Sequence, residues 1–140
     1  MSRQRAQSSF YFDLASPYAY LASHRVDEPI PDVVWRPILV GALHKKHGRI
    51  GWGFTEQRAS GMHEVERRAR NYGLPAVRWP NPYPANSLTA MRAATHASNL
   101  GRGRKFARAA FALAFEHGSD LAQSSRWPRQ PGKATSIPLT

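Results

Sequence analysis

The pattern that most constrains the fold lies in residues 10–37, where an aromatic run, a helix start and a valine-rich run follow one another. Phe10-Tyr11-Phe12 predicts a strand that is buried on both faces. Ser16-Pro17 predicts the start of a helix that continues to Arg25, because serine caps free N–H groups and proline is tolerated at the first helical position. Val33-Val34-Trp35 predicts a second strand, which Pro37 ends. The whole pattern predicts a βαβ unit with two parallel strands.

Helices dominate the rest of the pattern. Residues 38–54 are irregular and rich in glycine, which favours a loop with one helical turn. Met62, Val65, Ala69 and Tyr72 recur at helical spacing before Gly73, which suits a left-handed cap. A further helix is expected to begin at Asn86 or Ser87, turn Leu88, Met91 and Ala94 inward and end near residues 99–101. Residues 104–117 predict a helix with a broad apolar stripe, and residues 122–140 predict a disordered tail.

The composition excludes several function classes. The 140 residues contain no cysteine, so the chain has no thiols of its own for dithiol exchange. No apolar run is long enough to cross a bilayer, and the first residues do not form a secretory signal, so a cytoplasmic location is expected. The formal net charge of +11 favours anionic partners in general. The basic residues form no dense block with interleaved aromatics, so nucleic-acid binding is kept only as an alternative.

Four segments resemble one known family. Phe-Tyr-Phe-Asp-Leu-Ala-Ser-Pro-Tyr-Ala-Tyr at positions 10–20 is similar to the opening of the thioredoxin-like family that contains 2-hydroxychromene-2-carboxylate isomerases, kappa-class glutathione transferases and DsbA-type disulfide oxidoreductases. Ser16-Pro17-Tyr18-Ala19 stands where the disulfide-forming members have Cys-x-x-Cys. The resemblance continues through Trp35-Arg36-Pro37 to Ala42, Arg70 to Pro75 and Pro84 to Ser87.

The resemblance implies an α/β fold, namely a thioredoxin-like βαβ unit with an all-helical insertion. It implies a partial domain at residues 8–121 with the insertion at 56–118. The C-terminal ββα half of the family is not visible after Leu121, so a truncated or frameshifted gene product is expected. Residues 122–140 would then be the tail beyond this domain.

The resemblance also implies an activity, that of a glutathione-dependent isomerase or transferase. Ser16 would stabilise the glutathione thiolate, which would add to an unsaturated ring system, allow ring opening and bond rotation, and leave. Pro17, Tyr18 and Arg49 would help to bind glutathione; Arg49 follows Gly48 where the family often has asparagine. From the local sequence alone, however, Ser16 is a helix cap, which is the usual role of a serine before proline.

A substrate pocket is expected above the Ser16 turn, for a small aromatic or unsaturated molecule. Its candidate residues are Tyr20, Trp35, Arg36, Trp79 and Tyr83. Trp79 and Tyr83 flank the stiff segment Pro80-Asn81-Pro82, and aromatic side chains commonly line such pockets. Arg36, Arg49 and Arg58 are candidates to meet a carboxylate.

A metal site and a non-catalytic role are the two other interpretations of the sequence. His44 and His47 lie three residues apart, but no third ligand is near them in sequence, so no metal site is expected. The chain could instead be a catalytically inactive remnant that acts through protein association. In that case its apolar helix face or open sheet edge would pair with another chain, such as a second copy in a homodimer.

Overall fold

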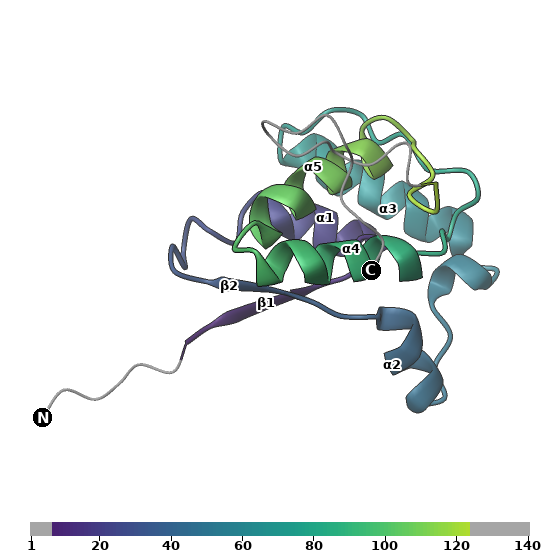
Figure 1. Ribbon diagram of the computed structural model, residues 1–140. Coiled ribbons are helices and arrows are strands. Elements are labelled where there is room, and N and C mark those ends of the chain that lie inside the picture. Colours follow the sequence, from purple (N-terminus) through teal and green to yellow (C-terminus); the bar gives the residue numbers. More distant parts are fainter. Residues whose placement is uncertain (1–6, 124–140) are drawn as a thin grey trace, which may run out of the picture.

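The structure is a computed structural model that describes residues 7–123. Of the tail expected at residues 122–140, residues 124–140 lie outside the described part of the chain. Figure 1 shows a small sheet with helices stacked above it, and one helix that extends below the sheet.

The predicted βαβ unit is confirmed. Strand β1 (Ser9–Phe12) and strand β2 (Val34–Pro37) form a parallel two-stranded sheet, in which Ser9 lies opposite Val34. Helix α1 (Pro17–Ser23) connects them. It is shorter than predicted, because the backbone tightens at its end: the N–H of His24 donates to the carbonyl of Leu21 at 3.3 Å.

Only one face of the sheet is covered by helices. Phe12 and Trp35 are buried, and Phe10 packs edge-on against the Trp35 ring with ring centroids 5.0 Å apart. Tyr11 points to the other face and is 58% exposed. The prediction that this strand is buried on both faces is therefore wrong, because α4 and α5, defined below, lie together above the sheet (Figure 1).

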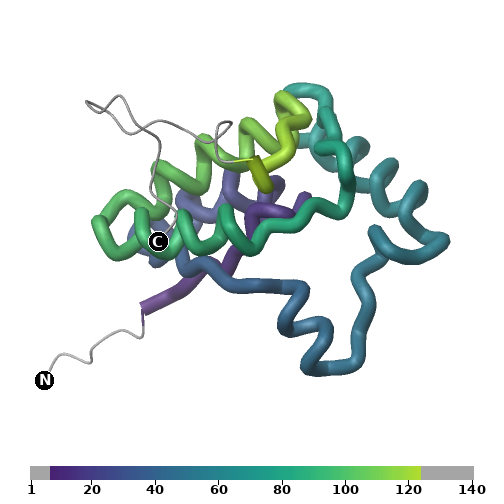
Figure 2. The backbone as a smooth tube through the Cα atoms, turned by 45° about the vertical axis from the view of Figure 1, so that its right-hand side comes forward, coloured from purple at the N-terminus to yellow at the C-terminus, as the bar shows by residue number. Residues whose placement is uncertain are grey.

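Residues 38–54 contain more helix than the sequence predicted. Helix α2 (Val40–Lys46) and the short 3-10 helix η1 (Trp52–Phe54) replace the expected loop. None of the residues of α2 is buried. Figures 1 and 2 both show α2 apart from the other helices, which explains why no apolar periodicity marked it in the sequence.

Three longer helices complete the described fold: α3 (Arg58–Asn71), α4 (Leu88–Asn99) and α5 (Gly103–Phe115). Gly73 follows α3 with a φ of 72°, as its predicted cap role requires. Leu88 was expected to face inward but is exposed at the start of α4. Tyr72, which recurs at helical spacing in the sequence, is also exposed and lies under the guanidinium of Arg25.

Small residues let α4 and α5 approach each other closely. Ala93, Ala94 and Ala97 of α4 are fully buried, as are Ala107 and Ala110 of α5. Phe111 of α5 then reaches the sheet, where its ring centroid lies 6.0 Å from that of Phe12. The broad apolar stripe predicted for α5 is thus the centre of the core.

Candidate functional site

The turn between β1 and α1 presents the serine that the sequence singled out. Ser16 is the N-cap of α1, and its Oγ accepts a hydrogen bond from the N–H of Ala19 at 3.2 Å. Pro17 follows at the first helical position, where it has no N–H to leave unpaired. Within residues 7–123, the Ser16 hydroxyl only accepts a hydrogen bond, so its O–H is available to donate to a ligand.

Asp13 ties this turn to the start of α2. Its carboxylate is buried and accepts hydrogen bonds from the N–H of Ala15 and the N–H of Val40, each at 2.9 Å. Its carbonyl oxygen accepts from the N–H of Ser16, also at 2.9 Å. One residue therefore fixes two segments that are far apart in the sequence.

A cavity of about 820 Å³ opens beside this turn. This is the size range of small-molecule sites in proteins. Three segments form its wall: residues 13–18 at the β1–α1 turn, residues 39–57 around α2 and η1, and residues 83–88 before and at the start of α4. Ser16 lies in this wall.

Aromatic side chains form one side of the cavity. The Trp52 ring contacts the rings of Tyr18 and Tyr83, with centroids 6.2 Å and 6.0 Å away. Trp52 packs so closely on Gly61 of α3 that a Cβ at that position would lie 2.5 Å from the ring. The Trp52 ring can therefore occupy this position in the cavity wall only because residue 61 is glycine.

Tyr83 supplies a neutral phenol to this wall. Burial is the main cause that raises the pKa of Tyr83 to about 12, with Arg58 opposing the rise and Tyr18 adding to it. Arg58 also holds the backbone here, because its Nη2 donates to the carbonyl of Tyr83 at 3.1 Å. At neutral pH the Tyr83 hydroxyl is therefore protonated and able to donate a hydrogen bond.

The structure brings only some of the predicted site residues together. Ser16, Pro17, Tyr18 and Tyr83 line the cavity. Arg49 is exposed in the loop after α2, next to the lining residue Ile50.

Four predicted pocket residues lie elsewhere. Tyr20 and Trp35 are buried in the core, where they pack against Phe111 and Phe12. The Arg36 side chain lies at the open sheet face and donates to Ser9 Oγ at 2.8 Å. Trp79 lies behind the cavity: its ring packs edge-on against Tyr83, and its Nε1 donates to Glu66.

Sequence reasoning missed much of the cavity wall. Asp13 was not predicted to line a site, although an aspartate three residues before a helix cap is a signal for a turn that its carboxylate closes. Leu39, Trp52 and Phe54 come from a segment that was expected to be mainly a loop. Asn86 and Ser87 were expected only to start a helix.

Within residues 7–123, no three His, Asp or Glu side chains gather in a way that could hold a metal ion. Among the helices of the same residues, none is long and apolar enough to cross a membrane.

Comparisons with known proteins show a family match and a structural neighbour for this chain. Residues 9–128 match the family described as DSBA-like thioredoxin domain. A solved structure of 2-hydroxychromene-2-carboxylate isomerase superposes with a TM-score of 0.66 at 20% sequence identity, over 84% of this chain and 60% of the isomerase chain. This chain therefore spans only part of the length of that neighbour. A search among curated proteins finds no match.

The structural likeness confirms the thioredoxin-like fold that the sequence predicted. The family match spans most of the sequence, from the first strand onward. The chain therefore belongs to the DSBA-like thioredoxin domain family.

Proposed function

We propose that this protein binds glutathione and works as a glutathione-dependent isomerase or transferase, with Ser16 stabilising the thiolate. The observation that carries the proposal is the position of Ser16 in the wall of a large, mainly apolar cavity, with a hydroxyl that accepts one hydrogen bond and can still donate another. A hydroxyl that donates to a thiolate favours the ionised form and so lowers the thiol pKa.

The residues present fit the thiol end of glutathione. Ser16 would donate to the sulfur, and Pro17 and Tyr18 form the adjacent wall. For a glutathione carboxylate, Arg49 is the candidate, because it is exposed beside the cavity and the described residues pair its side chain with no other group.

When bound, glutathione supplies a nucleophilic thiolate that can add to an unsaturated substrate and leave again. The protein's own residues would orient the two molecules and exclude water. The aromatic wall of Tyr18, Trp52 and Tyr83 would hold a flat substrate, and the neutral Tyr83 phenol could donate a hydrogen bond to an oxygen of that substrate. A cytoplasmic location belongs to the same proposal, since glutathione maintains the reducing state there.

The structural neighbour is named for its action on 2-hydroxychromene-2-carboxylate. Because this chain spans 60% of that neighbour's length, its activity is proposed from the Ser16 site and not transferred with the fold.

Calorimetric titration with glutathione tests the proposal through two variants. Ser16→Ala removes both the cap and the hydroxyl, whereas Ser16→Asp keeps a capping side chain and removes the hydroxyl donor. Both variants should bind glutathione weakly or not at all, while only Ser16→Ala should lose about 1 kcal/mol of stability. If the wild-type protein does not bind glutathione, or if both variants bind it as well as the wild type, the proposal is wrong.

A second candidate function is protein association through the open face of the sheet. Parallel sheets are normally covered on both faces, yet Tyr11 on this face is 58% exposed and the helices α4 and α5 cover the opposite one (Figure 1). Analytical ultracentrifugation should then detect self-association that Tyr11→Lys weakens and Leu100→Lys, on a different exposed site, does not. A wild-type monomer at all concentrations would exclude a homodimer.

A further inference from the structure

The charges around the cavity limit what it can bind. Among the described residues that line it there is no lysine or arginine, and Asp13 is the one carboxylate. The other lining residues are mainly apolar or aromatic, with a few neutral hydroxyl and amide groups and His44. The wall thus offers hydrogen bonds but no fixed positive charge.

Asp13 offers no positive charge to a ligand carboxylate either. Its carboxylate accepts two backbone hydrogen bonds and adds no cation to the wall. A ligand carboxylate inside the cavity would be removed from water without a cationic partner in the wall, which costs several times the energy of an ordinary hydrogen bond.

Two nearby arginines, Arg58 and Arg68, donate hydrogen bonds to groups of the protein itself. Arg58 donates through its Nε and Nη2 to the carbonyl of Tyr83. Arg68 donates to Glu64 at 2.8 Å, and its guanidinium lies 5.5 Å from the centroid of the Tyr18 ring. Arg49 remains, outside the lining residues, and the proposed function uses it for glutathione.

We propose that the cavity takes an uncharged, flat aromatic substrate and discriminates against a substrate that carries a carboxylate. The inference rests on the proposed function only in taking this cavity as the substrate site. The shape of the ligand follows from the aromatic wall of Tyr18, Trp52 and Tyr83, and its neutrality follows from the missing cation.

Two probes of similar shape test the charge requirement directly. The methyl ester of 2-naphthoic acid and the 2-naphthoate anion are titrated separately into the protein at neutral pH, without glutathione, and binding is followed by tryptophan fluorescence. The ester should bind roughly tenfold more tightly or better, because only the anion leaves an unpaired charge in the wall. Equal or tighter binding of the anion, or no binding of either probe, would overturn the inference.

An ester is also more apolar than a carboxylate, so it could bind more tightly for that reason alone. A variant must therefore show that the missing positive charge in the wall causes the preference for the ester. Leu88→Lys places an ammonium group at the cavity, where Leu88 is 40% exposed. The variant should narrow or reverse the preference for the ester. Leu100→Lys adds the same charge at an exposed site outside the lining and should leave the preference unchanged. An unchanged preference in Leu88→Lys would contradict the inference.

These titrations separate the two proposals. Glutathione is absent from them, so selective ester binding by a protein that fails to bind glutathione supports the neutral-ligand site and rejects the proposed enzyme. Conversely, glutathione binding that depends on Ser16, together with tight naphthoate binding, supports the enzyme and rejects the neutral-ligand site.

Discussion

Asp13 and Ser16 have different roles at the β1–α1 turn. Ser16 faces the cavity with a hydroxyl that can act on a ligand, whereas both carboxylate oxygens of Asp13 are engaged by backbone N–H groups. Asp13 is thus a positioning residue: it keeps the Ser16 turn and the start of α2 at a fixed separation. The cavity exists because these two segments are held side by side.

Loss of the Asp13 carboxylate should destabilise the protein. Asp13→Ala leaves the N–H groups of Ala15 and Val40 without their acceptor, and the expected loss in the free energy of unfolding is about 2–4 kcal/mol. Asp13→Asn keeps one acceptor oxygen and should lose less. Denaturant unfolding measures both effects, with the exposed Asp32→Ala as the control, for which a change within about 0.5 kcal/mol is expected. A neutral Asp13→Ala would contradict the positioning role.

His24 should make stability depend on pH. Burial is the main cause that lowers its pKa from the ordinary 6.5, Arg108 lowers it further, and Glu116, whose Oε2 lies 3.9 Å from the His24 Nε2, opposes the shift. The fully buried Tyr20 donates to the same carboxylate. Because the folded state binds the proton less readily, protonation favours the unfolded chain. The contribution of neutral His24 to the free energy of unfolding is therefore fully present above pH 6.5 and is lost as the pH falls below that value.

Thermal unfolding between pH 7.5 and pH 5 measures this dependence. His24→Gln should flatten the fall in melting temperature relative to the wild type. His47→Gln, at the exposed end of α2, controls for the loss of a histidine. An identical pH profile in His24→Gln and the wild type would show that His24 does not contribute.

At the scale of elements, the position of Trp52 depends on α3. Gly61→Ala puts a methyl group where the Trp52 ring now lies, at 2.5 Å. The ring must move, so the cavity should bind aromatic probes less tightly, and the clash should exceed the gain in helix propensity of about 1 kcal/mol. Gly41→Ala on α2 is the control for stability alone, since Gly41 itself lines the cavity: no atom lies within 4 Å of the added Cβ, and the variant should be slightly more stable. Unchanged probe affinity in Gly61→Ala would contradict the account of this wall.

How well each element could be predicted follows from what marks it in the sequence. The βαβ unit, the Gly73 cap and the stripe of α5 are encoded by residues close together in the chain, and they were predicted. Helix α2 buries none of its residues, so it carries no periodic apolar signal, and only one helical turn was predicted for residues 38–54.

The candidate site was predicted only in part, because only some of its residues lie close together in the sequence. Ser16 was found because its cap and the residues around it are contiguous. The cavity joins residues 13–18, 39–57 and 83–88, whose convergence is a product of tertiary packing. Tyr20 and Trp35 are aromatic, as pocket residues often are, but the helices above the sheet bury them in the core.

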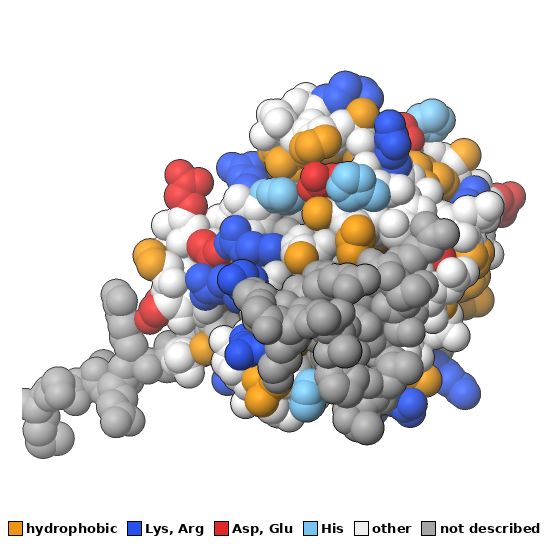
Figure 3. Space-filling model, turned by 45° about the horizontal axis from the view of Figure 1, so that its top comes forward, with side chains coloured by type: hydrophobic (Ala, Val, Ile, Leu, Met, Phe, Trp, Pro, Cys, Tyr) orange, Lys and Arg blue, Asp and Glu red, His pale blue; other side chains and the backbone are white. Residues whose placement is uncertain are grey.

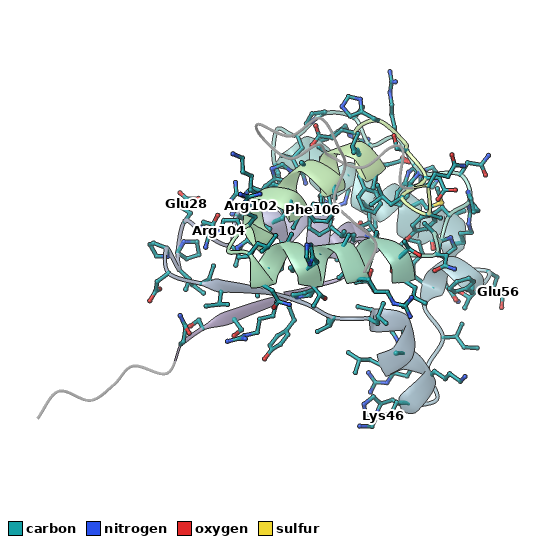
Figure 4. All side chains as sticks on the ribbon, viewed as in Figure 1. Glu28, Lys46, Glu56, Arg102, Arg104 and Phe106 are labelled. Atoms are coloured by element: carbon teal, nitrogen blue, oxygen red, sulfur yellow. The ribbon has the colours of Figure 1, made fainter. Side chains whose placement is uncertain are left out.

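At the scale of the whole molecule, the many Lys and Arg side chains do not form one uniform patch on the face that Figure 3 shows. On that face, Lys and Arg side chains lie among acidic residues and histidines. Some of these charges hold the fold together: Asp27, in the turn before β2, pairs with Arg104 and Arg108 of α5 and accepts from the Trp35 Nε1. Figure 4 shows Lys46 at the far end of α2, and Arg102 and Arg104 at the start of α5.

The arrangement of the whole molecule separates its two open surfaces. The helices α4 and α5 build the core on one face of the sheet, the exposed Tyr11 marks the other face, and α2 closes the cavity beside the Ser16 turn (Figures 1 and 2). Ligand binding at the cavity and association at the sheet face can therefore be tested with variants that share no residue.

The most direct test of the central claim is the ionisation of the glutathione thiol on the protein. Thiolate formation is followed by ultraviolet absorbance across pH, with glutathione alone, with the wild-type protein and with Ser16→Ala. The bound thiol should ionise about one pH unit or more below the ordinary cysteine value of about 8.5, and Ser16→Ala should return the titration toward that of free glutathione. A titration that the wild-type protein leaves unchanged, or that Ser16→Ala shifts as far as the wild type does, would contradict the role of Ser16.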